Sequence, residues 1–267
     1  MHLSYSQINL FNECAKLWQA SYQLGKKQGP DHNLVFGSAI HKAVELRLTG
    51  KAPDLLKLWE TLWWDDFASR PGKVVWHITK EECYETGVRI FSSRQVLALL
   101  DQVKVKKDLW GRPMVERKVE WRIDGLPPVI GFIDAIAADG VPVDFKTASR
   151  MWSPGRALQE TQPLFYIAAL NELGETDHNY RFRHFVITKG LFPVARVFES
   201  QRTPEQVEDM RRAVVAVWRK IEEGAFEANP KSWLCSPACP VIASCRAGRE
   251  KWFGVENEHM TNVMSES

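Results

Sequence analysis

The stretch Val129–Thr147, VIGFIDAIAADGVPVDFKT, carries the pattern that decides the fold. Two apolar runs in it flank Ala-Asp-Gly, which is typical of a hairpin turn between antiparallel strands. On such a hairpin Asp134 and Asp144 can meet across the two strands. Lys146 leaves the same face of the second strand as Asp144, because side chains alternate along a strand.

These two carboxylates and the ammonium group lie among apolar residues, where charge is costly to bury without compensation. One interpretation is an ordinary salt bridge at a sheet edge, the more common origin of an isolated D-x-K pattern. The other is a site for Mg²⁺ or Mn²⁺, since carboxylate oxygens suit hard divalent cations. An ion held there can bind a phosphate oxygen and acidify a water, which Lys146 can orient or deprotonate.

Working outward from the hairpin, the hydrophobic periodicity predicts helices on the N-terminal side and a mixture of strands and helices on the C-terminal side. The expected helices cover residues 4–24, 36–48, 54–67, 79–100, 161–173 and 204–223, and the expected strands cover 115–123, 129–136, 141–147, 180–188 and 194–199. Residues 149–160 are expected to form a loop. This order predicts a mixed α/β fold with a central sheet.

Composition describes an ordinary globular chain. The sequence has 267 residues, 45% hydrophobic and 25% charged, with a net charge of +2. This excludes a polycation, so any binding of nucleic acid must come from local patches. No apolar run approaches the roughly 20 residues of a membrane span, and the N-terminus lacks a signal-peptide pattern. We therefore expect a cytoplasmic protein whose five cysteines are ligands, nucleophiles or core rather than disulfides.

Further polar residues stand at suggestive places. His41 lies in an amphipathic helical run, and Gln162 and Tyr166 are four apart on one helix face. Taken alone, each has an ordinary structural explanation. Glu116 and Glu120 share one face of the preceding strand. One interpretation is that either adds an outer carboxylate to the site, and the simpler one is that this face of the strand is solvated.

Taken in order, these motifs resemble the RecB-type branch of the PD-(D/E)XK nuclease superfamily. The series is G-x-x-x-H (Gly37, His41), G-x-I-D (Gly131, Asp134), D-x-K (Asp144, Lys146) and Q-x-x-x-Y (Gln162, Tyr166). The resemblance implies a restriction-endonuclease-like fold, in which a mixed central sheet is flanked by helices. It also implies that His41, Asp134 and Asp144 bind the metal, with Asp134, Asp144 and Lys146 as catalytic residues, and that Gln162 and Tyr166 contact DNA. Pro163 departs from the pattern and is compatible only with the first turn of a helix.

The cysteines form a second constellation. Cys235, Cys239 and Cys245 give C-x3-C-x5-C, and Cys14 is the obvious fourth ligand, whereas Cys83 lies mid-helix and is expected to be incidental. Four thiolates suit either [4Fe–4S] or Zn²⁺.

The same nuclease branch includes members with an iron–sulfur cluster, such as AddB and the CRISPR-associated RecB-like exonucleases. Their trailing motif is C-x2-C-x5-C, so this chain has one extra residue in the first gap. The resemblance favours iron–sulfur over zinc. A cluster that joins Cys14 to Cys235 closes a loop of about 220 residues, a restraint worth on the order of 5 kcal/mol.

The resemblance predicts one nuclease domain over residues 1–250, with a helical part at about 1–100, a catalytic core at about 101–225 and the cysteine segment at 226–250. Residues 251–267 are then a C-terminal tail. Basic and aromatic residues that can contact nucleic acid occur in two loops: Lys104, Lys106, Lys107, Trp110 and Arg112 in one, and Arg150, Trp152 and Arg156 in the other. Each loop is equally well explained as solvated surface.

The expected function is hydrolysis of DNA by a Mg²⁺- or Mn²⁺-dependent exonuclease acting on single strands or duplex ends. Expected settings are recombination, repair, phage DNA metabolism or CRISPR spacer acquisition. The sequence has no P-loop motif, so a helicase, recombinase or integrase is an expected partner rather than part of this chain. The alternative is a non-catalytic DNA-binding or adaptor module on the same fold.

Overall fold

The computed structural model describes residues 2–26, 29–69 and 74–254. The chain forms two compact units. The first contains residues 1–5 and 29–213, and the second contains residues 6–28 and 214–267. Among the described residues, none of the helices is both long enough and apolar enough to cross a membrane.

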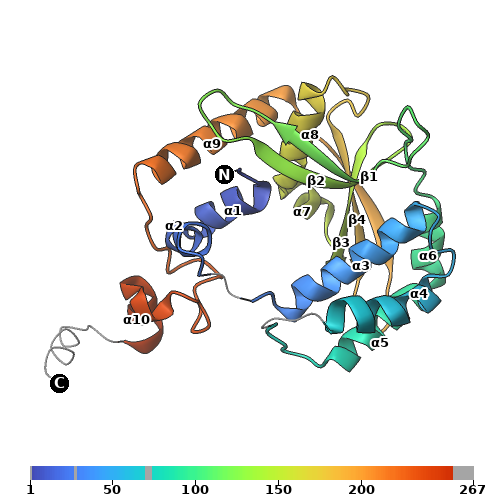
Figure 1. The fold of residues 1–267 in the computed structure, drawn as a ribbon, viewed down its shortest axis with the longest axis horizontal. Helices are drawn as coiled ribbons and strands as arrows, with labels where there is room; N and C mark the ends of the chain where they lie inside the picture. The colour runs from blue at the N-terminus through green and yellow to red at the C-terminus, as the bar shows by residue number, and fades with distance from the viewer. Residues whose placement is uncertain (1, 27–28, 70–73, 255–267) are drawn as a thin grey trace, which may run out of the picture. The chain divides into compact units, whose positions relative to one another are not determined.

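A five-stranded sheet in the order β1-β2-β3-β4-β5 forms the centre of the first unit (Figure 1). Its strands are β1 (Val115–Trp121), β2 (Val129–Ile136), β3 (Pro142–Ala148), β4 (Arg181–Thr188) and β5 (Ala195–Gln201). Neighbouring strands are antiparallel except β3 and β4, which are parallel. A parallel pair needs a long crossover, and the helices between β3 and β4 supply it. The mixed sheet flanked by helices confirms the predicted fold class.

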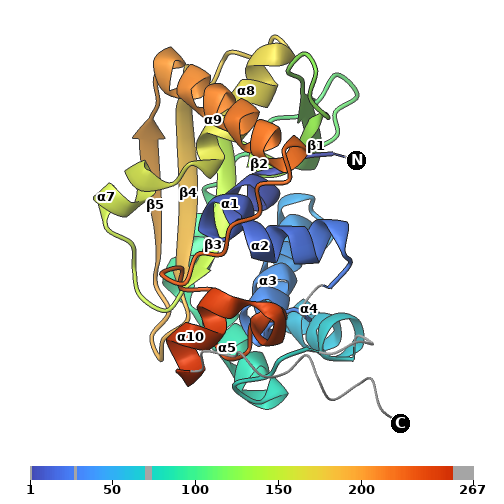
Figure 2. The same ribbon diagram turned by 90° about the vertical axis from the view of Figure 1, so that its left-hand side faces the viewer.

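One side of the sheet is covered by the N-terminal helices (Figures 1 and 2). These are α3 (His32–Leu48), α4 (Leu55–Thr61), which continues as a π-helical segment over Leu62–Ala68, α5 (Lys80–Ser92) and α6 (Arg94–Asp101). Phe36 and Ile40 of α3 belong to one buried cluster with Phe145 and Phe185 of the sheet. This packing fixes α3, and therefore His41, against the strands.

The other side carries α7 (Pro154–Gln159) and α8 (Gln162–Glu172). The ring of Tyr166 on α8 stacks on Phe182 of β4, with their centroids 6.0 Å apart. Trp152 and Ala157 pack with Val186 of β4 and Phe198 of β5. The α9 helix (Pro204–Glu222) follows β5, and its residues from Val214 onward belong to the second unit.

The expected elements differ from the structure mainly where one side chain starts a new helix. The helix expected over 79–100 is two helices, because the Ser93 hydroxyl accepts the N–H of Val96 and caps α6. The loop expected over 149–160 contains α7, which Ser153 caps and Pro154 begins. The expected helix over 36–48 starts earlier, after the Asp31 cap.

The second unit contains the remaining helices. They are α1 (Tyr5–Glu13), of which Tyr5 belongs to the first unit, α2 (Ala15–Trp18), a π-helical segment over Gln19–Gln23, a 3₁₀ turn over Ile242–Ser244 and α10 (Arg246–Phe253). The single helix expected over 4–24 is interrupted at Cys14, whose backbone is extended. Trp18 stacks on Phe226, with their ring centroids 5.9 Å apart, and this contact joins the N-terminal segment to the C-terminal one.

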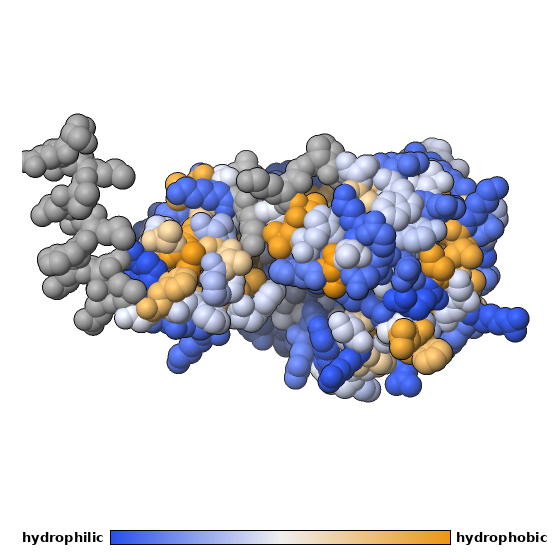
Figure 3. Space-filling view, turned by 90° about the horizontal axis from the view of Figure 1, so that it is seen from below, coloured by the Kyte–Doolittle hydropathy of each residue, from blue (hydrophilic) through white to orange (hydrophobic). Residues whose placement is uncertain are grey.

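Exposed hydrophobic side chains are dispersed over the surface. On the face seen in Figure 3 they form small patches that hydrophilic side chains separate. Scattered exposed apolar residues are normal for a folded protein, so an individual one acquires meaning only from its neighbours.

Candidate active site and cysteine centre

The two aspartates of the decisive hairpin lie where β2 and β3 separate. The strands pair at Ala135–Val143 and Ile136–Pro142, and the next pair in this register is Asp134 with Asp144. There the ladder stops, and Asp134 Oδ2 instead accepts the backbone N–H of Phe145 at 2.7 Å. The side chain of Asp134 thus occupies the gap that the diverging strands leave open.

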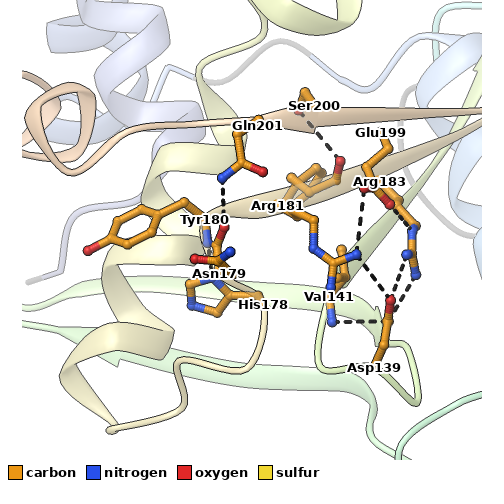
Figure 4. A network of polar contacts seen from close by, with 11 residues as sticks. Asp139, Val141, His178, Asn179, Tyr180, Arg181, Arg183, Glu199, Ser200 and Gln201 are labelled. Carbon is orange, nitrogen blue, oxygen red and sulfur yellow. Dashed lines mark hydrogen bonds and ion pairs between the residues drawn. The ribbon is translucent and has the colours of Figure 1, made fainter.

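The tip of this hairpin is anchored by ion pairs (Figure 4). Arg183 of β4 contacts Asp139 at 2.6 Å and Glu199 of β5 at 2.6 Å. Arg181 lies 3.4 Å from the same Asp139 carboxylate. Burial opposes ionisation of Asp139, but Arg183 outweighs it and lowers the pKa of the carboxyl. The anchored turn fixes the register that places Asp134 opposite Asp144.

His41, Glu116 and Asp134 converge on one point. One donor atom from each lies within 4.8 Å of the others, and among the residues that the structure describes no other three His, Cys, Asp or Glu side chains do so. His41 Nδ1 is 3.4 Å from Asp134 Oδ2. Burial would lower the pKa of His41, but the hydrogen bond and charge of Asp134 raise it above its ordinary value. One imidazole and two carboxylates form a donor set that fits a divalent cation.

Glu116 was not among the predicted metal ligands. The register pairs Val115 with Ala135 and Arg117 with Ile133, which puts Glu116 opposite Asp134. Its φ of 45° lies in the left-handed region, which is rare for a residue other than glycine. Burial and the nearby Asp134 raise the pKa of its carboxyl. Glu120, the other candidate for an outer carboxylate, is instead paired with Arg122 at 2.5 Å.

Asp144 and Lys146 form a buried pair beside this group. Asp144 is only 1% exposed, and burial raises its pKa to about 6 despite the neighbouring ammonium. Lys146 Nζ lies 2.9 Å from Oδ1 and 2.8 Å from Oδ2, and the hydrogen bond goes to Oδ1. Oδ2 has no hydrogen-bond partner among the described residues. A buried carboxylate oxygen that contacts an ammonium group but accepts no hydrogen bond is a further feature that fits a metal site.

From Lys146 a chain of hydrogen bonds leads to α8. Lys146 Nζ donates to Gln162 Oε1 at 2.8 Å, and Gln162 Nε2 donates to the hydroxyl of Tyr166 at 2.9 Å. Pro163 lies in the first turn of α8, as its position requires. A Cβ added to Gly131 would lie 2.9 Å from the ring of Tyr166, so a glycine is needed there for the ring to approach β2. The structure therefore brings all six predicted site residues of the first unit into two adjoining groups.

The four predicted cysteine ligands line one cavity of the second unit, together with apolar residues such as Leu17, Val241 and Ile242. Cys235, Cys239 and Cys245 each close a turn, donating the backbone N–H to the carbonyl three residues earlier. Cys83 is buried on α5 in the first unit, where burial raises the pKa of its thiol to about 11. Four cysteines that line one apolar pocket fit a metal or iron–sulfur centre.

The two basic loops differ in what they expose. Trp110 is 76% exposed, and Arg112 lies over its ring, 4.8 Å from the centroid. Trp152 is 7% exposed, because it packs against His184 and the guanidinium of Arg156 covers it. The interpretation of Trp152 as a residue that can contact nucleic acid is therefore wrong, because almost none of its surface is exposed.

The sequence model of the PD-(D/E)XK nuclease superfamily matches residues 2–246. No curated protein matches the chain.

Two solved structures resemble this one. A crystal structure of a candidate exonuclease from Eubacterium rectale aligns with a TM-score of 0.53 and 12% identity, covering 89% of this chain and 86% of that chain. The crystal structure of SSO0001 aligns with a TM-score of 0.30 and 13% identity, covering 50% of this chain and 59% of that chain, which is too slight a likeness to support an argument. The first supports the fold, and the family match extends over most of the sequence. The chain therefore belongs to the PD-(D/E)XK nuclease superfamily.

Proposed function

We propose that this protein is a Mg²⁺- or Mn²⁺-dependent deoxyribonuclease that acts as an exonuclease on DNA ends. The observation that carries the proposal is the convergence of His41, Glu116 and Asp134 beside the buried Asp144–Lys146 pair. We assign His41, Asp134 and Asp144 to the metal, and we add Glu116 to this set. Asp134, Asp144 and Lys146 are the proposed catalytic residues.

A bound divalent ion supplies a Lewis acid for the scissile phosphate and lowers the pKa of a coordinated water. The role of Lys146 follows from its hydrogen bonds. Its ammonium has three N–H donors, and the bonds to Asp144 and Gln162 use two of them. The third can hold the attacking water or a phosphate oxygen. Gln162 then orients Lys146 and lines the path of the DNA. Tyr166, predicted to contact DNA as well, is only 7% exposed, so we assign it the role of holding Gln162 through its hydroxyl.

We further propose that Cys14, Cys235, Cys239 and Cys245 hold a structural [4Fe–4S] cluster. The four cysteines line one apolar pocket, which suits either zinc or an iron–sulfur cluster. The preference for iron–sulfur comes from the cysteine pattern, in which Cys14 precedes the nuclease motifs and C-x3-C-x5-C follows them. The cluster supplies a cross-link between distant parts of the sequence.

The biological setting follows from the class of reaction. Removal of nucleotides from DNA ends serves recombination, repair, phage DNA metabolism and spacer acquisition in the cytoplasm. A helicase, recombinase or integrase is the kind of partner that would deliver such ends.

The test is cleavage of end-labelled single-stranded and duplex DNA with Mg²⁺ or Mn²⁺, resolved by size. Asp144→Ala should abolish cleavage and leave the fold intact. Asp124→Asn, which changes an exposed carboxylate outside the site, is the matched control and should cleave like the wild type. A folded wild type that binds DNA but never cuts it with either metal would establish the adaptor function instead.

A further inference from the structure

The rung of the sheet next to the candidate metal site carries an aromatic ring and a lysine. The register pairs Lys118 of β1 with Phe132 of β2. Phe132 lies two residues before Asp134, and Lys118 lies two residues after Glu116. Side chains two residues apart share a face and are separated by about 6.6 Å. Phe132 therefore shares its face of β2 with Asp134, and Lys118, which is paired with Phe132, lies on the same face.

Phe132 is 52% exposed although it lies within a strand of the central sheet. Its neighbour Ile133, which points to the opposite face, is fully buried. Isolated exposed apolar residues need no functional explanation, but Phe132 is next to the candidate metal group. A substrate bound at the metal must pass close to its half-exposed ring.

Lys118 supplies positive charge on the same rung. The carboxylates nearest to it along β1 are Glu116, which belongs to the candidate metal group, and Glu120, which is paired with Arg122. Lys118 is exposed, and no carboxylate of the described residues lies within ion-pair distance of its ammonium group. The lysine is thus available to a negatively charged ligand.

We propose that Phe132 and Lys118 bind the nucleotide next to the scissile phosphate, the ring stacking on its base and the ammonium contacting its phosphate. Stacking on one face of a base requires that the base be free of its duplex neighbours. The rung therefore selects single-stranded DNA, or the frayed end of a duplex. This inference rests on the proposed nuclease function and names the form of its substrate.

The experiment uses single-stranded oligonucleotides in which one abasic position is moved through the nucleotides nearest the cleaved bond. In the wild type, one position should raise KM by about five- to hundredfold, the range for loss of one base–aromatic stack. Phe132→Ala should raise KM to a similar extent on intact DNA, with little change in kcat, and the abasic position should then have no further effect. Phe132→Tyr should retain wild-type behaviour. Phe192→Ala, at an 89% exposed ring on the β4–β5 loop, is the control.

Lys118→Ala tests the phosphate contact. It should reduce the slope of log affinity against log salt by about 0.7, the value for one phosphate of a single strand. Unchanged KM in Phe132→Ala, or an equal abasic penalty in Phe132→Ala and wild type, would overturn the inference while leaving the nuclease proposal intact. If the wild type cuts nothing, the nuclease proposal fails, and the same abasic comparison by fluorescence anisotropy decides the stacking inference on binding alone.

Discussion

Asp134 accepts the backbone N–H of Phe145 across the point where their strands stop pairing. A side chain here replaces the main-chain carbonyl that a continuous ladder would provide. Asp134 therefore has a structural and a functional role. Its carboxylate accepts the Phe145 N–H where β2 and β3 stop pairing, and it also contacts His41 of the candidate metal group. Structural and functional effects of changing it can be separated by the choice of substitution.

Asp134→Asn should keep the fold and lose the metal. The amide oxygen can still accept the Phe145 N–H, but the negative charge is gone. We expect a melting temperature close to that of the wild type and at least about 100-fold weaker Mn²⁺ binding, since even the partners of metal ligands are worth 10- to 100-fold. Calorimetric titration with Mn²⁺ measures this. Wild-type affinity in the variant would remove Asp134 from the ligand set.

Gly131→Ala should disturb Tyr166. The new methyl group would lie 2.9 Å from the tyrosine ring, so the ring or β2 must move. We expect a loss of about 1–3 kcal/mol in the free energy of unfolding, together with slower cleavage. Urea denaturation measures the stability. Gly155→Ala is the control, because the nearest atom to its added Cβ is 4.0 Å away, and an equal loss in both variants would contradict the argument.

Because of His184, we expect the free energy of unfolding to decrease as the pH falls. The ring is fully buried beside Trp152 and Phe182, and neither nitrogen has a hydrogen-bond partner among the described residues. Burial, with the positive charges of Lys146 and Arg202, lowers its pKa to about 3. Between that value and about 6.5 the unfolded chain binds a proton that the folded chain does not.

The stabilisation from this group is therefore complete at pH 7 and is lost as the pH falls. The loss from pH 7 to pH 5 is about 2 kcal/mol. His184→Phe should flatten this part of the curve of unfolding free energy against pH, whereas His77→Gln, at an exposed histidine, should not. Parallel curves for wild type and His184→Phe would refute the assignment.

Cys239→Ser should release the cluster and loosen the fold. Anaerobically purified wild type should be brown and contain iron and sulfide, and the variant should be colourless. Loss of the cross-link should lower the free energy of unfolding by up to about 5 kcal/mol. Cys83→Ala should retain the colour, because this thiol lies in the other unit. A colourless wild type with stoichiometric zinc would replace the iron–sulfur assignment.

The sequence predicted those site residues that stand at regular positions of a single strand pair or a single helix. The hairpin that carries Asp134 and Asp144 shows its strand alternation and its turn directly, and the structure has both strands there. The positions of Gln162 and Tyr166 one turn apart were likewise readable, because helix geometry links residues four apart.

Glu116 was one of two glutamates considered as outer carboxylates, and the local pattern did not distinguish it from Glu120 or from a solvated face. Its membership of the metal group depends on the register between β1 and β2 and on a left-handed backbone conformation. Neither the register nor the backbone conformation can be predicted from the local sequence. A glutamate that alternates with apolar residues along a strand is usually a solvent-exposed residue. The burial of Trp152 could not be predicted for a related reason, because it depends on contact with His184 of β4, which is distant in the sequence.

The unusual backbone of Glu116 has an implication for engineering. A φ of 45° is a conformation that glycine or asparagine adopts with less strain than glutamate. Under the metal role proposed for Glu116, replacing it with glycine should raise the free energy of unfolding and weaken cleavage. Selection for thermostability alone would then favour variants that have lost this ligand.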